Sequence, residues 1–226
     1  MQPLVLLHGA IGASSQLASI AAAFPEKKIL CPDLSGHGQA PFAGSFSIEG
    51  FAKEVLGYMD SRGIGKADFF GYSMGGYIAL HLAATCPERV GKIITLATKF
   101  AWSPEIAASE VRMLNASKIE EKLPDFARTL QERHGDWKQV LQNTATMMLE
   151  LGEEQPLKPE VLDGIQQKVL LMAGDRDRMV SLEETIAAYR QLPAAALCVL
   201  PHTPHPIEQM DTQLIVEQMI RFLTAD

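Results

Sequence analysis

The sequence predicts an α/β fold built on a mostly parallel, six-stranded sheet flanked by helices. Short apolar runs alternate with segments of helical period up to about residue 100, and the alternation resumes near residue 168. This pattern is typical of β-α units. Residues 100–167 instead have helical spacing throughout and no β-branched runs. We therefore expect a core formed by residues 1–99 and 168–226, with a helical cap inserted at 100–167.

Six short, mainly apolar runs are the expected strands. They span residues 3–7, 28–32, 67–70, 90–97, 169–173 and 195–200. The run 90–97 is apolar along both faces, as a parallel strand covered by helices on both sides is. Apolar residues spaced three and four apart predict the helices between them. We expect helices that start at Ser14 or Ser15, at Ser47 and after residue 76, two more at 182–192 and 207–223, and three or four short ones in the cap.

Composition excludes several classes of protein. The 226 residues are 47% hydrophobic and 21% charged, which suits one globular domain. The net charge of −7 comes without a basic cluster, so nucleic acid is not an expected partner. No apolar run approaches the roughly 20 residues of a membrane helix.

The cysteines argue against a disulfide framework and against a zinc site. There are three of them, Cys31, Cys86 and Cys198, and none forms a Cys-x-x-Cys pair. Residues 3–13 are apolar but have no positively charged segment before them, so we interpret them as a strand and turn and not as a signal peptide. We therefore expect a cytoplasmic protein.

The segment Gly71-Tyr72-Ser73-Met74-Gly75 fits the pattern Gly-x-Ser-x-Gly. An expected strand precedes it and an expected helix follows it, which is the context in which this pattern forms a nucleophile elbow. The turn is so tight that side chains at the two glycine positions would collide with neighbouring elements. Ser73 is therefore the candidate nucleophile.

At these residues the chain resembles the α/β-hydrolase superfamily, and the resemblance extends over nearly its whole length. The segment His8-Gly9-Ala10 resembles the His-Gly turn of that family. The resemblance implies that the backbone N–H groups of Ala10 and Met74 form an oxyanion hole. Residues 33–38 resemble the family's Asp-x-x-Gly-His-Gly loop, which is structural. Fuller family members begin with two antiparallel strands that this sequence lacks, so we expect only the six parallel strands, with a different sheet edge exposed.

The acid is expected in the segment 174–180, which matches the family pattern Gly-x-x-Asp-x-x-Val. In this fold the chain order of the triad is Ser, Asp, His. Position in the pattern favours Asp177. Asp175 is the alternative, and its other interpretation is a loop residue that accepts hydrogen bonds from nearby backbone.

Two histidines, His202 and His205, follow the last expected strand. The ending His-Pro-Ile-Glu resembles the family's usual surroundings of the catalytic base, which favours His205, with His202 as the alternative. A metal site is not expected, because no third-ligand motif accompanies the two histidines. No cofactor motif is present either.

A serine needs an imidazole to accept its proton and a carboxylate to orient that imidazole. The resemblance therefore implies a serine hydrolase of the carboxylesterase type, acting on a small or medium, apolar carboxylic ester by acyl transfer to Ser73. Alternatives are a small-ligand receptor with little turnover, or a thioesterase, carbon–carbon hydrolase or aminopeptidase. The partner is a small-molecule substrate, and the chain is expected to be a monomer or homodimer.

The cap contains large apolar residues, which we expect to attach it to the core more often than to line a substrate pocket. They are Phe100, Trp102, Met113, Leu114, Phe126, Trp137, Met147, Met148 and Leu149.

Overall fold

The computed structural model describes residues 2–225 and contains one six-stranded sheet in the order β2-β1-β3-β4-β5-β6. All five strand pairs are parallel, so the predicted fold class is confirmed. The strands are β1 (Leu4–Leu7), β2 (Ile29–Leu30), β3 (Ala67–Tyr72), β4 (Val90–Leu96), β5 (Val169–Gly174) and β6 (Ala195–Leu200).

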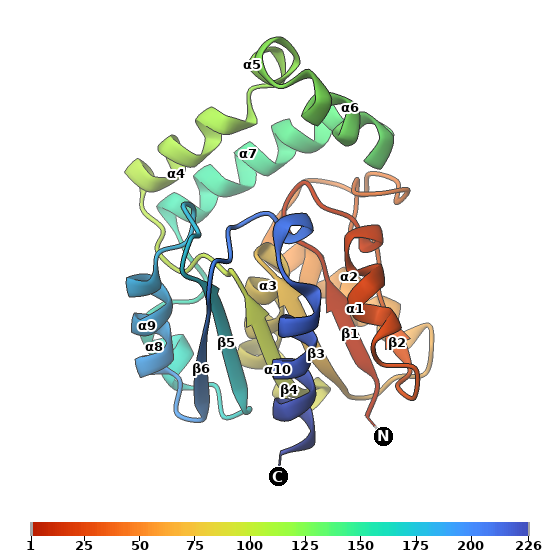
Figure 1. Ribbon diagram of the computed structural model, residues 1–226, viewed down its shortest axis with the longest axis vertical. Helices are drawn as coiled ribbons and strands as arrows, with labels where there is room; N and C mark the ends of the chain where they lie inside the picture. The colour runs from red at the N-terminus through yellow and green to blue at the C-terminus, as the bar shows by residue number, and fades with distance from the viewer. Residues whose placement is uncertain (1, 226) are drawn as a thin grey trace.

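Helices cover both faces of the sheet (Figure 1). One face carries α2 (Ile48–Asp60), α3 (Met74–Thr85), α8 (Pro159–Asp163) and α9 (Leu182–Gln191), and the other carries α1 (Ala18–Ala22) and α10 (Thr212–Thr224). Successive residues of a strand point to opposite faces. In β1, Val5 and Leu7 therefore pack on the first face, and Leu4 and Leu6 on the second. This double burial explains why β1 is apolar at every position.

Capping side chains determine where several helices begin. Ser47 accepts a hydrogen bond from the Gly50 N–H over 3.0 Å and starts α2, as the sequence predicts. Two other expectations were inexact. The helix expected at Ser14 or Ser15 begins as a 3₁₀ turn, Ser14–Leu17, with Ala13 at its cap position. The expected closing helix is interrupted because Asp211 accepts from two backbone N–H groups and starts α10 anew.

Five segments between β4 and β5 form the cap region: α4 (Pro104–Glu110), a 3₁₀ turn (Val111–Leu114), α5 (Ala116–Lys122), α6 (Pro124–Arg133) and α7 (Trp137–Glu153). Helices α4 to α7 lie above one end of the sheet, where the loops after the strands gather (Figure 1). Helix α8, which belongs to the expected insertion 100–167, lies beside α9, and its Leu162 joins the core of the sheet. The helices over the strand ends therefore finish with α7.

Within residues 2–225, no helix combines the length and the apolar character needed to cross a bilayer.

Candidate active site

Ser73 lies in a strained turn between β3 and α3. Its backbone has φ 52° and ψ −116°, a conformation that L-residues rarely adopt. A side chain on Gly71 would collide with the backbone of Gly76, and one on Gly75 would collide with the carbonyl group of Leu7. The two glycines of the motif are therefore required by close backbone contact, and they leave the serine at the end of the strand.

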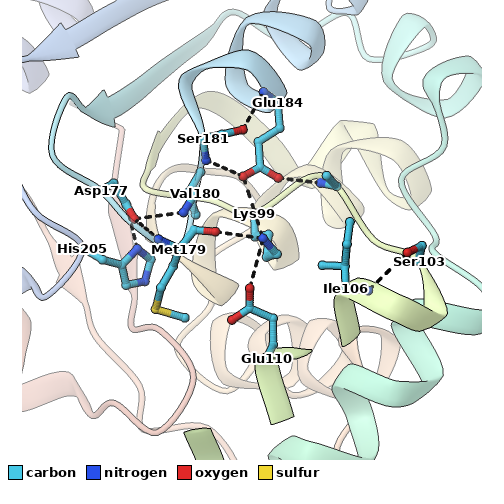
Figure 2. Close-up of polar contacts among 11 residues, drawn as sticks. Lys99, Ser103, Ile106, Glu110, Asp177, Met179, Val180, Ser181, Glu184 and His205 are labelled. Carbon is cyan, nitrogen blue, oxygen red and sulfur yellow. Dashed lines mark hydrogen bonds and ion pairs between the residues drawn. The ribbon is translucent and has the colours of Figure 1, made fainter. Parts of the chain in front are cut away.

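The loops after β5 and β6 bring Asp177 and His205 together (Figure 2). His205 Nδ1 donates to Asp177 Oδ2 over 2.7 Å. The other carboxylate oxygen, Oδ1, accepts from the backbone N–H groups of Met179 at 2.8 Å and Val180 at 2.9 Å. These three hydrogen bonds orient both side chains. The proton on Nδ1 leaves Nε2 of His205 free to act as a base.

Asp177 is held in its ionised form. Its side chain is only 1% exposed, and this burial by itself raises the pKa of the carboxyl group. The hydrogen bond from His205, the charge of that imidazole and the two backbone N–H groups act in the opposite direction and dominate, so the pKa lies below its usual value. The carboxylate can therefore stabilise an imidazolium at His205.

Asp175 and His202 lie elsewhere. Asp175 Oδ1 accepts from the Thr203 N–H over 3.2 Å and so connects the loops after β5 and β6. His202 is exposed and has φ 53°. The two cavities that contain Ser73 are lined by His205 and by neither of these residues.

Ser73 and His205 line the same two cavities, but no hydrogen bond joins their side chains in the part of the chain that the structure describes. Such contacts are often long before a substrate binds. Tyr72 holds the backbone of His205 in place, because its hydroxyl group donates to the His205 carbonyl oxygen over 2.9 Å. Nothing in the sequence indicated this role, because Tyr72 occupies a variable position of the motif.

Ala10 and Met74, the expected oxyanion residues, both border the first cavity beside Ser73. Met74 is the first residue of α3, where the helix dipole is positive. Within residues 2–225, neither backbone N–H group donates a hydrogen bond to the protein. Both are therefore available to an incoming oxygen atom.

Buried side chains support the loop that carries Ala10. His8 Nδ1 donates to the Gly9 carbonyl oxygen over 2.8 Å, and Nε2 accepts from the Leu34 N–H over 3.1 Å. Burial lowers the pKa of His8 to about 4, so this histidine is neutral and structural. Ile11, the residue after Ala10, has a φ of 51°, which is unfavourable for a β-branched side chain.

Two cavities meet at Ser73. One is narrow, with a volume of about 40 Å³, and the other is wider, about 220 Å³. Both are bordered by Ala10, Ser73, Met148, Met179 and His205. An ester positioned at Ser73 can therefore place its acyl group in one cavity and its alcohol group in the other.

The large apolar residues of the cap divide between three environments. Trp102, Met147 and Met148 line the narrow cavity, whereas Leu114 and Phe126 line the wider one. Phe100 and Trp137 pack in hydrophobic clusters. Met113 and Leu149 are exposed. The cap thus contributes more to the cavity walls than its sequence suggested.

The comparison with known families identifies the fold. The profile of the family described as "alpha/beta hydrolase fold" matches residues 2–136. The chain belongs to this family. The matched residues include β1, β3 and β4 and the turn that carries Ser73.

Several relatives of this hydrolase-fold chain have names that describe ester hydrolysis. It is 32% identical over 93 residues to the lipase LipV of Mycobacterium tuberculosis, a match that covers 41% of this chain and 36% of the lipase. It is 32% identical over 130 residues to a pimeloyl-(acyl-carrier protein) methyl ester esterase of Pectobacterium carotovorum, covering 57% of this chain and 49% of the esterase. The chain thus aligns with half or less of these two relatives.

A solved structure agrees over almost the whole chain. A putative lipase of Acinetobacter baumannii superimposes with a TM-score of 0.84 at 19% identity, covering 98% of this chain and 83% of that one. At this identity the likeness shows the fold alone. Within residues 2–225, no group of three or more His, Cys, Asp or Glu side chains is arranged to hold a metal ion.

Proposed function

We propose that this protein is a serine hydrolase that cleaves carboxylic esters with Ser73 as nucleophile, His205 as base and Asp177 as the acid that orients it. The observation that carries the proposal is the 2.7 Å hydrogen bond from His205 to a buried Asp177, made on the wall of the cavities that contain Ser73. Few structural roles require a buried carboxylate, an imidazole and a strained serine at one end of a sheet.

In the first half-reaction, Nε2 of His205 takes the proton of Ser73 as the serine oxygen attacks the ester carbonyl carbon. The carbonyl oxygen becomes negative and accepts hydrogen bonds from the N–H groups of Ala10 and Met74. Loss of one such donor costs about 3 to 4 kcal/mol in the transition state. The intermediate collapses when the bond to the alcohol oxygen breaks, and His205 donates its proton to that oxygen.

In the second half-reaction, water attacks the acyl-serine. His205 takes a proton from the water molecule, a second tetrahedral intermediate forms, and the bond to Ser73 breaks as the serine recovers its proton. The carboxylic acid product then leaves. Asp177 stays ionised throughout and stabilises the imidazolium that exists in each tetrahedral state.

The substrate class is a small or medium ester with mainly apolar groups. Most of the narrow cavity is lined by apolar side chains, among them Ile48, Tyr77, Met147 and Leu151. Its volume of about 40 Å³ suits a group of only a few heavy atoms. The names of the lipase and of the methyl ester esterase among the relatives support ester cleavage.

The test is a steady-state series of p-nitrophenyl esters with acetyl, butyryl and octanoyl groups, with Ser73→Ala as the inactive reference. We expect kcat/KM to be highest for the acetyl or butyryl ester and to fall at least about tenfold for the octanoyl ester. Ser73→Ala is expected to lose all measurable turnover. Stabilisation of the fold by an ester without turnover would instead favour a ligand-binding protein.

A further inference from the structure

The narrow cavity beside Ser73 contains an ion pair among its apolar walls. Lys99 follows β4, and Glu110 is the last residue of α4. Lys99 Nζ lies 3.4 Å from Glu110 Oε1 and donates to the Met179 carbonyl oxygen over 2.8 Å (Figure 2). Both side chains are largely buried, with 15% and 13% of their surface exposed. This pair is not part of the triad, and a purely apolar group in the cavity would form no polar contact with it.

A second carboxylate lies near the same lysine. Glu184 Oε1 is 3.9 Å from Lys99 Nζ. Both oxygens of Glu184 are already used, since Oε1 accepts from the Ser181 N–H at 2.7 Å and Oε2 from the Ala101 N–H at 2.8 Å. Glu184 is therefore structural, but its charge counts. One lysine and two glutamates give this cluster of side chains a net charge of −1.

Two buried polar atoms at this place have no partner within residues 2–225. They are Oε2 of Glu110, an acceptor, and Nε1 of Trp102, a donor, and both residues line the narrow cavity. Burying a polar group without a hydrogen bond is costly, most of all for a charged one. A ligand that donates to Glu110 and accepts from Trp102 would relieve both.

We propose that the narrow cavity binds a hydroxyl group of the substrate, so that the preferred ester carries a short hydroxylated acyl or alcohol group. This inference rests on the proposed ester hydrolysis. The cavity, with a volume of about 40 Å³, requires a small group. A hydroxyl group is small and can both donate and accept a hydrogen bond. It donates to Glu110 Oε2 and accepts from Trp102 Nε1.

Charged groups fit this place less well. A carboxylate in the cavity would lie beside the negative charge of Glu110, and it has no proton to donate to Glu110 Oε2. An ammonium group has no lone pair and could not accept from Trp102 Nε1. A methyl group fits by size but leaves Glu110 Oε2 and Trp102 Nε1 without hydrogen bonds. The site therefore discriminates in favour of a neutral hydroxyl group.

The test compares esters in which a hydroxyl group replaces a methyl group of similar size. The acyl arm pairs methyl 3-hydroxybutyrate with methyl 3-methylbutyrate, and the alcohol arm pairs 2-hydroxyethyl butyrate with propyl butyrate. We expect kcat/KM to favour the hydroxylated ester about tenfold or more in one arm, which identifies the part of the ester that enters the cavity. Monomethyl succinate, which adds a carboxylate, is expected to be hydrolysed more slowly than either acyl-arm ester.

Two variants assign the preference to these residues. Lys99→Met/Glu110→Leu removes both charges together, so that neither is left unpaired, and it should reduce the preference to within about twofold. Trp102→Phe keeps the ring and removes only the N–H group, so it should reduce the preference even if the double variant fails to fold. The control is Glu105→Leu, an exposed position on the same helix α4 that lines neither cavity, and it should keep the full preference.

The result also separates this inference from the proposed function. Hydrolysis of p-nitrophenyl acetate by the wild-type protein, with no hydroxyl preference in either arm, would overturn the inference and leave the function standing. A preference that survives in the folded double variant and in Trp102→Phe would overturn it as well, and so would faster hydrolysis of monomethyl succinate. A protein without activity on any ester would overturn the function itself.

Discussion

Arg133 donates from Nη1 to the carbonyl oxygen of Ile11 over 3.1 Å and so connects helix α6 with the loop that carries Ala10. Its Nη2 donates over 2.8 Å to Oε1 of Glu208, which lies three residues after His205. His134, the residue after Arg133, also donates to the Ile11 carbonyl oxygen, over 2.9 Å. Helix α6, the loop that carries Ala10 and the segment that follows His205 are thus joined at one guanidinium group.

Arg133 is therefore a positioning residue. Arg133→Met should free the strained Ile11 peptide, misplace the Ala10 N–H group and lower kcat about tenfold, with a smaller change in KM. Steady-state kinetics on a small p-nitrophenyl ester measures the split. Arg128→Met, on the same helix and 69% exposed, is the matched control. Equal kinetics for both variants would show that the connection does not serve the reaction.

Replacing each of the two candidate acids, Asp177 and Asp175, by asparagine should affect kcat differently. Asp177→Asn replaces the carboxylate that accepts the hydrogen bond from Nδ1 of His205. It should lower kcat about 10³- to 10⁴-fold because the imidazole loses its correct tautomer. Asp175→Asn keeps an acceptor for the Thr203 N–H and should change kcat less than about threefold. The reverse order would exchange the assignments.

The turn at Ser73 should tolerate no side chain at Gly75. Gly75→Ala brings a Cβ against the Leu7 and His8 carbonyl groups and should lower the free energy of unfolding by about 3 kcal/mol. Gly57→Ala is the control, since Gly57 is exposed within α2 with open space around it, and alanine there should stabilise the fold by about 0.5 to 1 kcal/mol. Urea denaturation compares the two. A stable Gly75→Ala protein would refute the tight contact.

Buried histidines should make the protein less stable in mild acid. Burial lowers the pKa of His8 to about 4 and holds the pKa of His37 well below its usual value. The unfolded chain then binds protons that the folded chain does not, so stability is full above about pH 6.5 and is lost as the pH falls from there toward the folded pKa. His8 alone should contribute a loss of about 2 kcal/mol between pH 7.5 and pH 5.

Urea titrations at these two pH values measure the loss. His8→Gln is expected to be less stable at pH 7.5 but to lose less stability on acidification than the wild-type protein. Equal free energies of unfolding at both pH values in the wild type would contradict neutral burial of these histidines.

The fold was predictable because its signals are local. Strands buried on both faces, such as Leu4–Leu7 and Val169–Gly174, are apolar at every position, so the sequence shows both their place and their parallel arrangement. The turn at Ser73 is marked by its two flanking glycines, whose absence of side chains the backbone contacts require. Boundaries were less predictable, since single caps such as Asp211 restart a helix within an apolar pattern.

Pairs of charged side chains on different segments were not predictable. Lys99 lies in the loop after β4 and Glu110 ends α4, and each looks like an ordinary surface charge in the sequence until the fold buries them together. Arg133 and Glu208 are 75 residues apart. Such pairs depend on how the cap sits over the sheet, and no local pattern in the chain encodes that arrangement.

In the proposed mechanism, His205, held by Asp177, activates Ser73. Fluorophosphonate labelling tests it directly, because the reagent loses fluoride only to an activated serine oxygen, and peptide mass spectrometry then locates the adduct. We predict a single adduct on Ser73 that is lost in His205→Ala and kept in His202→Ala. An unlabelled wild-type protein, or an adduct on Ser73 that survives in His205→Ala, would contradict this mechanism.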